Sequence, residues 1–254
     1  MPHVTFIPLV GVRVREEELL ALGMSLPGLA PRAAAVGQLP ALGLLTLAGM
    51  LPPDWTCSYL PAERCDEGLI DRVIAERPTL VAISALTASI QEAYALGRRL
   101  RQSKLPVVLG GLHVTACPDE ASQHADAVVI GEGEAVWPQV LADAAAAALR
   151  PIYRPLPASG PPEWPLPRFD LLGAGPPRYT LQPQRGCPLA CDFCGASRLL
   201  GKFREKPAAA ICRELAQITS RTPRPLLELA DDNTFAGNRD PHELFDALSA
   251  AGAR

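Results

Sequence analysis

Short apolar runs alternate with segments of helical period from the N-terminus to about Arg150. Five such runs are bounded by turn residues and read as strands that are hydrophobic on both faces: HVTFIPLV, TCSYL, TLVAIS, PVVLGG and DAVVIGEG. Segments with a 3.6-residue apolar repeat lie between and after them, at 39–50, 66–77, 89–102 and 134–149. Strands buried on both faces and alternating with helices are typical of a parallel sheet. The pattern predicts an α/β domain, a doubly wound parallel sheet with helices on both sides.

The composition changes after this domain, because nine prolines fall within residues 151–177 and the helical repeat disappears. Such a stretch is typical of a stiff, extended linker. Beyond it, TLQPQRG and LLELADD read as strands, and 206–219 and 241–251 as helices. We therefore expect three parts: an α/β domain over 1–150, a Pro-rich linker over 151–178, and the first βα units of a second domain over 179–254.

Charge and apolar content exclude several classes of protein. The net charge is −3, so no basic field attracts nucleic acid or an anionic membrane surface. The apolar segments are too short for a transmembrane helix, and the N-terminus lacks the basic region and cleavage site of a signal peptide. Seven cysteines, an odd number, also argue against a secreted disulfide framework. We expect a cytoplasmic protein with no transmembrane segment and no nucleic-acid partner.

Three cysteines crowd into eight residues, and their spacing suggests a metal centre. Cys187, Cys191 and Cys194 have the spacing CxxxCxxC at the end of an expected strand. Three thiolates on one loop can hold three irons of a 4Fe–4S cluster and leave the fourth iron open. A structural zinc site is the alternative, but it requires four ligands, and the nearest further thiol is Cys212, in the middle of an expected helix.

The run RGCPLACDFCGASR, which contains this triad, resembles the signature of the radical S-adenosylmethionine (SAM) superfamily. The resemblance implies that SAM binds the open iron and is cleaved reductively to a 5′-deoxyadenosyl radical, with an electron from a donor such as flavodoxin or ferredoxin. It also implies that Phe193 lies beside the adenine of SAM; otherwise Phe193 is a core aromatic. Gly195, like Gly186, lacks a side chain that would keep the backbone from the cluster and SAM.

The second expected strand of this region ends in polar residues that the resemblance makes SAM ligands. In radical SAM barrels, polar side chains at this position hold the amino group of the methionine of SAM, which makes Asp231, Asp232 and Asn233 candidates. The alternative is an Asx-rich turn that caps the next helix.

Motifs in the N-terminal domain resemble those of cobalamin-binding domains. Ser84 and Leu86 match an SxL motif, and Gly110 and Gly111 match a GG motif, each at the carboxyl end of an expected strand. The resemblance implies that the nucleotide tail of cobalamin lies against these small residues.

A further run, DAVVIGEGEAVWPQVL, resembles a stretch common in the combined cobalamin and radical SAM family. It makes Gly131 and Gly133 candidate cobalamin contacts. Glu132 and Glu134 either accompany that contact or only stabilise the positive end of the following helix.

One cobalamin motif is missing. The DxHxxG motif, whose histidine ligates cobalt, is absent after the first strand, in the long segment from Gly11 to Gly37. We therefore expect bound cobalamin to lack a histidine ligand. The four histidines read as surface or packing residues: His3, His113, His124 and His242.

Together these resemblances imply a cobalamin-dependent radical SAM enzyme that transfers a methyl group to an unactivated carbon of a small-molecule substrate, or catalyses a related radical reaction. No catalytic residue can be named. The second domain has only two βα units of a partial barrel, so we expect the N-terminal part of a longer protein that is inactive alone. The rival hypotheses are a non-catalytic corrinoid- or cluster-binding module and a zinc-stabilised interaction protein.

Overall fold

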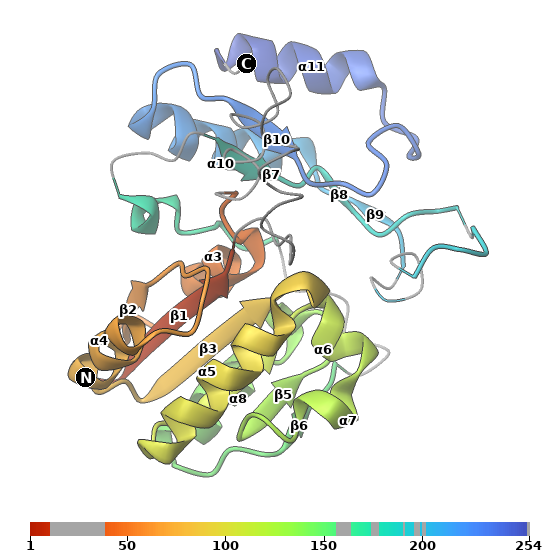
Figure 1. The fold of residues 1–254 in the computed structure, drawn as a ribbon. Coiled ribbons are helices and arrows are strands. Elements are labelled where there is room, and N and C mark those ends of the chain that lie inside the picture. Colours follow the sequence, from red (N-terminus) through yellow and green to blue (C-terminus); the bar gives the residue numbers. More distant parts are fainter. Residues whose placement is uncertain are drawn as a thin grey trace, which may run out of the picture.

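The computed structural model describes residues 1–10, 39–155, 164–173, 178–189, 191–195, 199 and 202–252. Its larger unit is a six-stranded sheet of order β2-β1-β3-β4-β5-β6 in which all neighbouring strands are parallel (Figure 1). This confirms the predicted doubly wound α/β class. The strands are β1 (His3–Leu9), β2 (Thr56–Tyr59), β3 (Leu80–Ala85), β4 (Val107–Gly110), β5 (Ala127–Val129) and β6 (Ile152–Tyr153).

Helices cover both faces of this sheet (Figure 1). Apolar residues of α4 (Glu67–Glu76), α5 (Ile90–Gln102), α6 (Leu112–Ala116) and α7 (Pro118–Ala121) pack on one face. Those of α3 (Leu42–Gly49) and α8 (Trp137–Ala145) pack on the other. Successive residues of a strand point to opposite faces, so strands between two helical layers must be apolar throughout. Thus Leu109 belongs to the first core and Val108 to the second.

Strand β6 lies inside the segment that the sequence predicts to be a linker. Its Tyr153 is buried, and the Tyr153 hydroxyl donates to a carboxylate oxygen of Asp143 at 2.8 Å. Two residues are too few to produce a periodic apolar signal, and the surrounding prolines hide the strand. The sheet therefore includes Ile152 and Tyr153, and the division of the chain into three parts stays a prediction.

The second unit contains a parallel pair of strands, β7 (Tyr179–Leu181) and β10 (Leu227–Leu229), and an antiparallel pair, β8 (Gln184–Arg185) and β9 (Arg204–Glu205). Two helices complete it, α10 (Ala208–Arg221) and α11 (Pro241–Ala250). It lies across the carboxyl ends of the larger sheet (Figure 1).

A shared apolar core joins the two units. Leu45 of α3 packs with Tyr179 of β7 and Ile218 of α10, together with Phe169 of a short 3-10 helix, η3 (Phe169–Leu172). The Thr180 hydroxyl also donates to the carbonyl oxygen of Pro40 at 3.2 Å, in a buried position. The second unit is therefore packed against the first along part of α3.

The segment from Gly11 to Gly37 lies outside the described residues. In the part of the chain that the structure describes, no helix combines the length and apolar character needed to cross a membrane.

Candidate functional site

A cavity of about 270 Å³ lies at the carboxyl ends of β3, β4 and β5, where the larger sheet meets the second unit. Its walls include residues from both units: Gln182, Arg185 and Ala230 come from the second. The exposed side chain of Leu86 is not among the residues that line it. The other residues predicted to bind cobalamin do line it: Ser84, Gly110, Gly111, Gly131 and Gly133.

Two glycines form the floor of the cavity, and the backbone requires glycine at only one of the two positions. Gly111 has a φ of 115°, and a Cβ there would lie 3.1 Å from the carbonyl oxygen of Ala85 and 3.2 Å from the Ser84 hydroxyl oxygen. Gly110 has ordinary backbone geometry, and its nearest contact would be the Cβ of Val129 at 3.9 Å. The fold itself requires glycine at 111, whereas at 110 the missing side chain mainly leaves space.

The remaining walls are largely apolar, with one unused donor. Leu44 and Leu47 of α3, Val108 of β4 and Trp137 of α8 line the cavity. The indole N–H of Trp137 is buried and has no hydrogen-bond partner among the described residues. Since buried donors in proteins are nearly always satisfied, a molecule that accepts this hydrogen bond would fit here.

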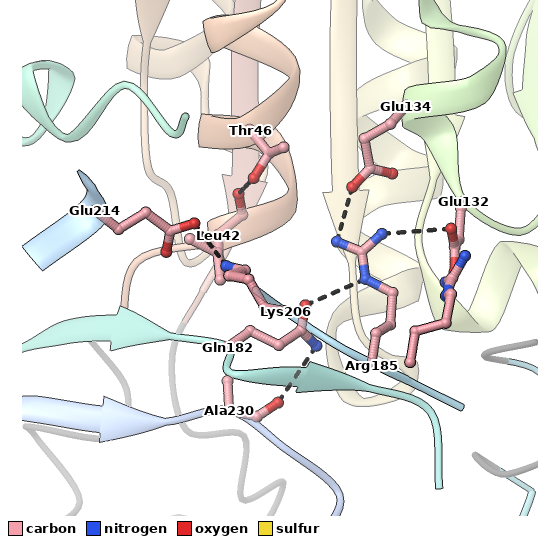
Figure 2. Close-up of polar contacts among 10 residues, drawn as sticks. Leu42, Thr46, Glu132, Glu134, Gln182, Arg185, Lys206, Glu214 and Ala230 are labelled. Carbon is pink, nitrogen blue, oxygen red and sulfur yellow. Dashed lines mark hydrogen bonds and ion pairs between the residues drawn. The ribbon is translucent and has the colours of Figure 1, made fainter. Parts of the chain in front are cut away.

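Buried ion pairs fix the loop after β5 to the strand that leads into the cysteines (Figure 2). One guanidinium nitrogen of Arg185 lies 2.8 Å from Glu134, and another lies 3.5 Å from Glu132. Glu132 also pairs with Arg204 of β9. The Arg185 side chain is 14% exposed and that of Glu134 is 8% exposed. The two carboxylates therefore pair with arginines of the second unit, which the sequence does not predict.

Arg185 is held from its other sides as well. Its Nε donates to the side-chain oxygen of Gln182 at 3.3 Å, and its guanidinium lies 5.1 Å from the centre of the Trp164 ring. Gln182 in turn donates to the carbonyl oxygen of Ala230 at 3.5 Å (Figure 2). Gly186 and Cys187 follow Arg185 directly, so the entry to the cysteine loop is anchored to the wall of the cavity.

A second buried ion pair joins Lys206, which directly follows β9, to Glu214 of α10 (Figure 2). The Lys206 ammonium donates to a carboxylate oxygen of Glu214 at 2.6 Å, and both side chains are nearly inaccessible. Burial lowers the pKa of Lys206 and raises that of Glu214, and the attraction between the two charges opposes both shifts. The pair ties β9 to α10.

The cysteine loop follows β8. Cys187, Cys191 and Cys194 are half-buried, and the backbone N–H of Cys194 donates to the carbonyl oxygen of Cys191 at 3.0 Å. Phe193 is 92% exposed, so the alternative that it is a core aromatic is wrong. A Cβ at Gly195 would meet nothing within 4 Å. Contact of Phe193 with adenine stays a prediction.

The residues after β10 form a turn that holds β8. Asp231 accepts from the backbone N–H of Gln184 at 3.0 Å, and Asn233 accepts from that of Phe235 at 3.1 Å, which makes an Asx turn. Asp232 is exposed. Burial raises the pKa of Asp231. The alternative hypothesis expected an Asx turn here that caps the next helix. The turn is present, but the N-cap of α11 is Asp240, which lies outside the turn.

Known proteins are similar to both units. Residues 28–141 match the B12 binding domain family. The chain is 27% identical over 187 residues to the bacteriochlorophyllide d C-12(1)-methyltransferase of Chlorobaculum tepidum, an alignment that covers 69% of this chain and 40% of that protein.

The hopanoid C-2 methylase of Rhodopseudomonas palustris is 29% identical over 209 residues, covering 79% of this chain and 38% of the relative. An uncharacterized methyltransferase of Synechocystis is 31% identical over 208 residues, covering 79% and 37%. These alignments extend beyond the B12 binding domain toward the region of the cysteine triad.

Residues 28–141 form a B12 binding domain, and these findings are consistent with a cobalamin-binding radical SAM family protein. The chain spans less than half the length of the three relatives above.

The family's cofactors can be tested against the residues present. The residues of the cavity suit a cobalamin site, because the glycine floor leaves space and the N–H of Trp137, which lines the cavity, is unsatisfied among the described residues. For the triad, the three thiol donors suit an iron–sulfur cluster. In the structure, the three sulfur atoms do not all lie within 4.8 Å of one another. Cys212, the nearest further thiol for zinc, is exposed on α10.

Loss of Arg185 should destabilise the chain by weakening the contact between its two units. Arg185→Met should lower the free energy of unfolding by about 3 kcal/mol, because it leaves the buried Glu134 carboxylate without its partner. Chemical denaturation measures the loss. The double variant Arg185→Met/Glu134→Met should regain part of it, since removing both charges removes the unpaired one.

The matched control is Arg99→Met, whose partner Glu67 is 71% exposed. A solvent-exposed pair of this kind contributes little. Equal losses of stability in the Arg99 and Arg185 variants would show that the ion pairs of Arg185 do not stabilise the contact between the two units.

Proposed function

We propose that this chain binds cobalamin in the cavity between its two units and carries a 4Fe–4S cluster and SAM on the adjoining cysteine loop. The whole protein would then be a radical SAM methyltransferase acting on an unactivated carbon. One observation carries the proposal: Arg185, two residues before Cys187, lines the same cavity as the SxL and GG motif residues Ser84, Gly110 and Gly111. The names of the relatives, which include methyltransferases for a chlorophyll-type pigment and a hopanoid, support the reaction class.

Each cofactor would supply a distinct part of the chemistry: the cluster an electron, SAM a radical that activates the substrate, and methylcobalamin the methyl group. Cys187, Cys191 and Cys194 would provide three thiolates and leave one iron open for SAM. The ion pairs of Arg185 would hold the cysteine loop at a fixed position relative to the cavity. The apolar walls from α3 and α8 would exclude water, which protects radical species from side reactions. A flavodoxin or ferredoxin would donate the electron, and the substrate would be a small molecule.

Anaerobic purification and metal analysis test this proposal directly. A brown protein that contains iron and sulfide, binds cobalamin and cleaves SAM in the presence of a reductant is expected. A colourless protein that contains zinc would support an interaction module instead. Cobalamin binding without iron would support a corrinoid carrier.

The cobalt of bound cobalamin should have no histidine ligand. No histidine lines the cavity in the described part of the chain, and none occurs between His3 and His113 in the sequence. The electron paramagnetic resonance spectrum of Co(II)-cobalamin on the protein should therefore be identical whether the histidines carry ¹⁴N or ¹⁵N. A change of the nitrogen coupling on labelling would show that a histidine of this chain ligates cobalt.

A further inference from the structure

A group of three different donor side chains lies outside the cavity and the cysteine loop. His113 of α6, Cys117, which precedes α7, and Glu120 of α7 bring one donor atom each to within 4.8 Å of the others. Their spacing, HxxxCxxE, repeats every three to four residues, so a helical path puts all three on one side. None of the three lines the cavity between the units.

The imidazole of His113 is oriented as a metal ligand would be. Its Nδ1 lies 3.2 Å from the hydroxyl of Thr87, in the loop after β3, and the ring of Tyr94 packs against it edge to face at 6.2 Å. With the proton on Nδ1 donated to Thr87, the lone pair of Nε2 faces the other two donors. Ligating histidines are commonly oriented by such a hydrogen bond from the second nitrogen.

The Nε2 atom of His113 is also unsatisfied. It is buried and has no hydrogen-bond partner among the described residues, and the nearest carboxylate oxygen, of Glu120, is 3.8 Å away. A buried imidazole nitrogen without a partner is costly. An ion between the three side chains would satisfy it.

We propose that His113, Cys117 and Glu120 form a binding site for one divalent transition-metal ion of the zinc type. Nitrogen, thiolate and carboxylate donors together suit Zn²⁺ or Co²⁺ rather than Mg²⁺ or Ca²⁺, which prefer oxygen. The thiol of Cys117 loses its proton on binding, so a thiolate and the Glu120 carboxylate neutralise the two positive charges. Glu120 is 48% exposed, and water supplies the fourth ligand from that side.

The site would connect the loop after β3 to the helices after β4. Thr87 follows the SxL motif directly, and α6 follows the GG motif directly. A bound ion would thus hold α6 and α7 together and, through His113 and Thr87, fix the loop that bears Leu86. Its expected consequence is a higher thermal unfolding midpoint in the presence of the metal.

Binding of Co²⁺ to the 254-residue chain tests the site. The measurement requires neither the iron–sulfur cluster nor an assay of enzyme activity. The test uses tag-free protein in which Cys187, Cys191 and Cys194 are replaced by Ser, so that the triad cannot hold the ion. Titration with Co²⁺ should give the intense absorption of a cobalt–thiolate bond and the visible bands of four-coordinate cobalt, at one ion per chain, and Zn²⁺ should displace it.

Adding Cys117→Ser should abolish the cobalt–thiolate absorption, and adding His113→Ala should weaken binding at least about tenfold. Cys65→Ser, which removes another half-buried thiol, is the matched control and should leave binding unchanged. Should the Cys117 variant fail to fold by circular dichroism, Glu120→Gln at an exposed position serves in its place and should also weaken binding at least about tenfold. Absence of the thiolate absorption in the triad-free chain would overturn the proposal, as would its persistence in Cys117→Ser or unchanged affinity in Glu120→Gln.

Discussion

Replacing Cys191 by Ala should eliminate the iron–sulfur absorption of the anaerobically reconstituted chain and leave no stoichiometric cluster iron. Two remaining thiolates cannot hold three irons of a 4Fe–4S cluster in place, and the half-buried loop offers no substitute thiol. Cys187→Ala and Cys194→Ala should behave in the same way. Iron and sulfide analysis, with the visible spectrum, measures the loss.

Cys57→Ala is the matched control for this loss. Cys57 is a half-buried thiol packed against the core between the sheet, α3 and α8. Burial raises the pKa of that thiol, which makes it a poor metal ligand. The control variant should keep its full complement of iron. Full retention of iron by Cys191→Ala would show that the triad does not bind the cluster.

Continuous apolar runs and helical repeats predict the sheet well because both depend on neighbouring residues. The five expected strands and the helices at 66–77 and 89–102 are present within a few residues of their expected bounds. Strand β6 was missed because it has only two residues and is stabilised by distant partners, such as Asp143. The short helices α6 and α7 were missed for a similar reason, since four or five residues carry little periodic signal.

The cavity could be predicted only in part. Motif resemblance identifies Ser84, Gly110 and Gly111, which lie at the carboxyl ends of β3 and β4 and therefore meet at one edge of the sheet. The opposite wall depends on how the second unit packs, and no local pattern encodes the pairing of Arg185 with Glu134, 51 positions away in the sequence. Glu132 and Glu134 next to a helix resemble ordinary acidic residues of a first turn. Only the structure shows that they face arginines.

Adding a side chain to the cavity floor at position 110 should weaken cobalamin binding while the fold is kept. Gly110 points to the same side of β4 as Val108, toward the cavity, and a Cβ there meets only Val129 at 3.9 Å. Valine is well accommodated in a strand, so Gly110→Val should unfold close to the temperature of the parent chain. Filling space that a ligand needs costs about 1–3 kcal/mol, which corresponds to an increase in Kd of about 5- to 150-fold.

Comparison with Gly111→Val separates binding from folding, because the two neighbouring glycines serve different purposes. At 111 the φ of 115° and the 3.1 Å approach to the Ala85 carbonyl oxygen make any side chain strained, so this variant should also lose about 1–3 kcal/mol of folding stability. Gly68→Ala on the exposed side of α4 is the control and should change neither cobalamin affinity nor the ligand-induced rise in unfolding temperature. Titration of each variant with hydroxocobalamin, followed by tryptophan fluorescence, measures Kd, and thermal denaturation measures stability. Parent-like affinity in Gly110→Val would show that cobalamin binds away from this floor.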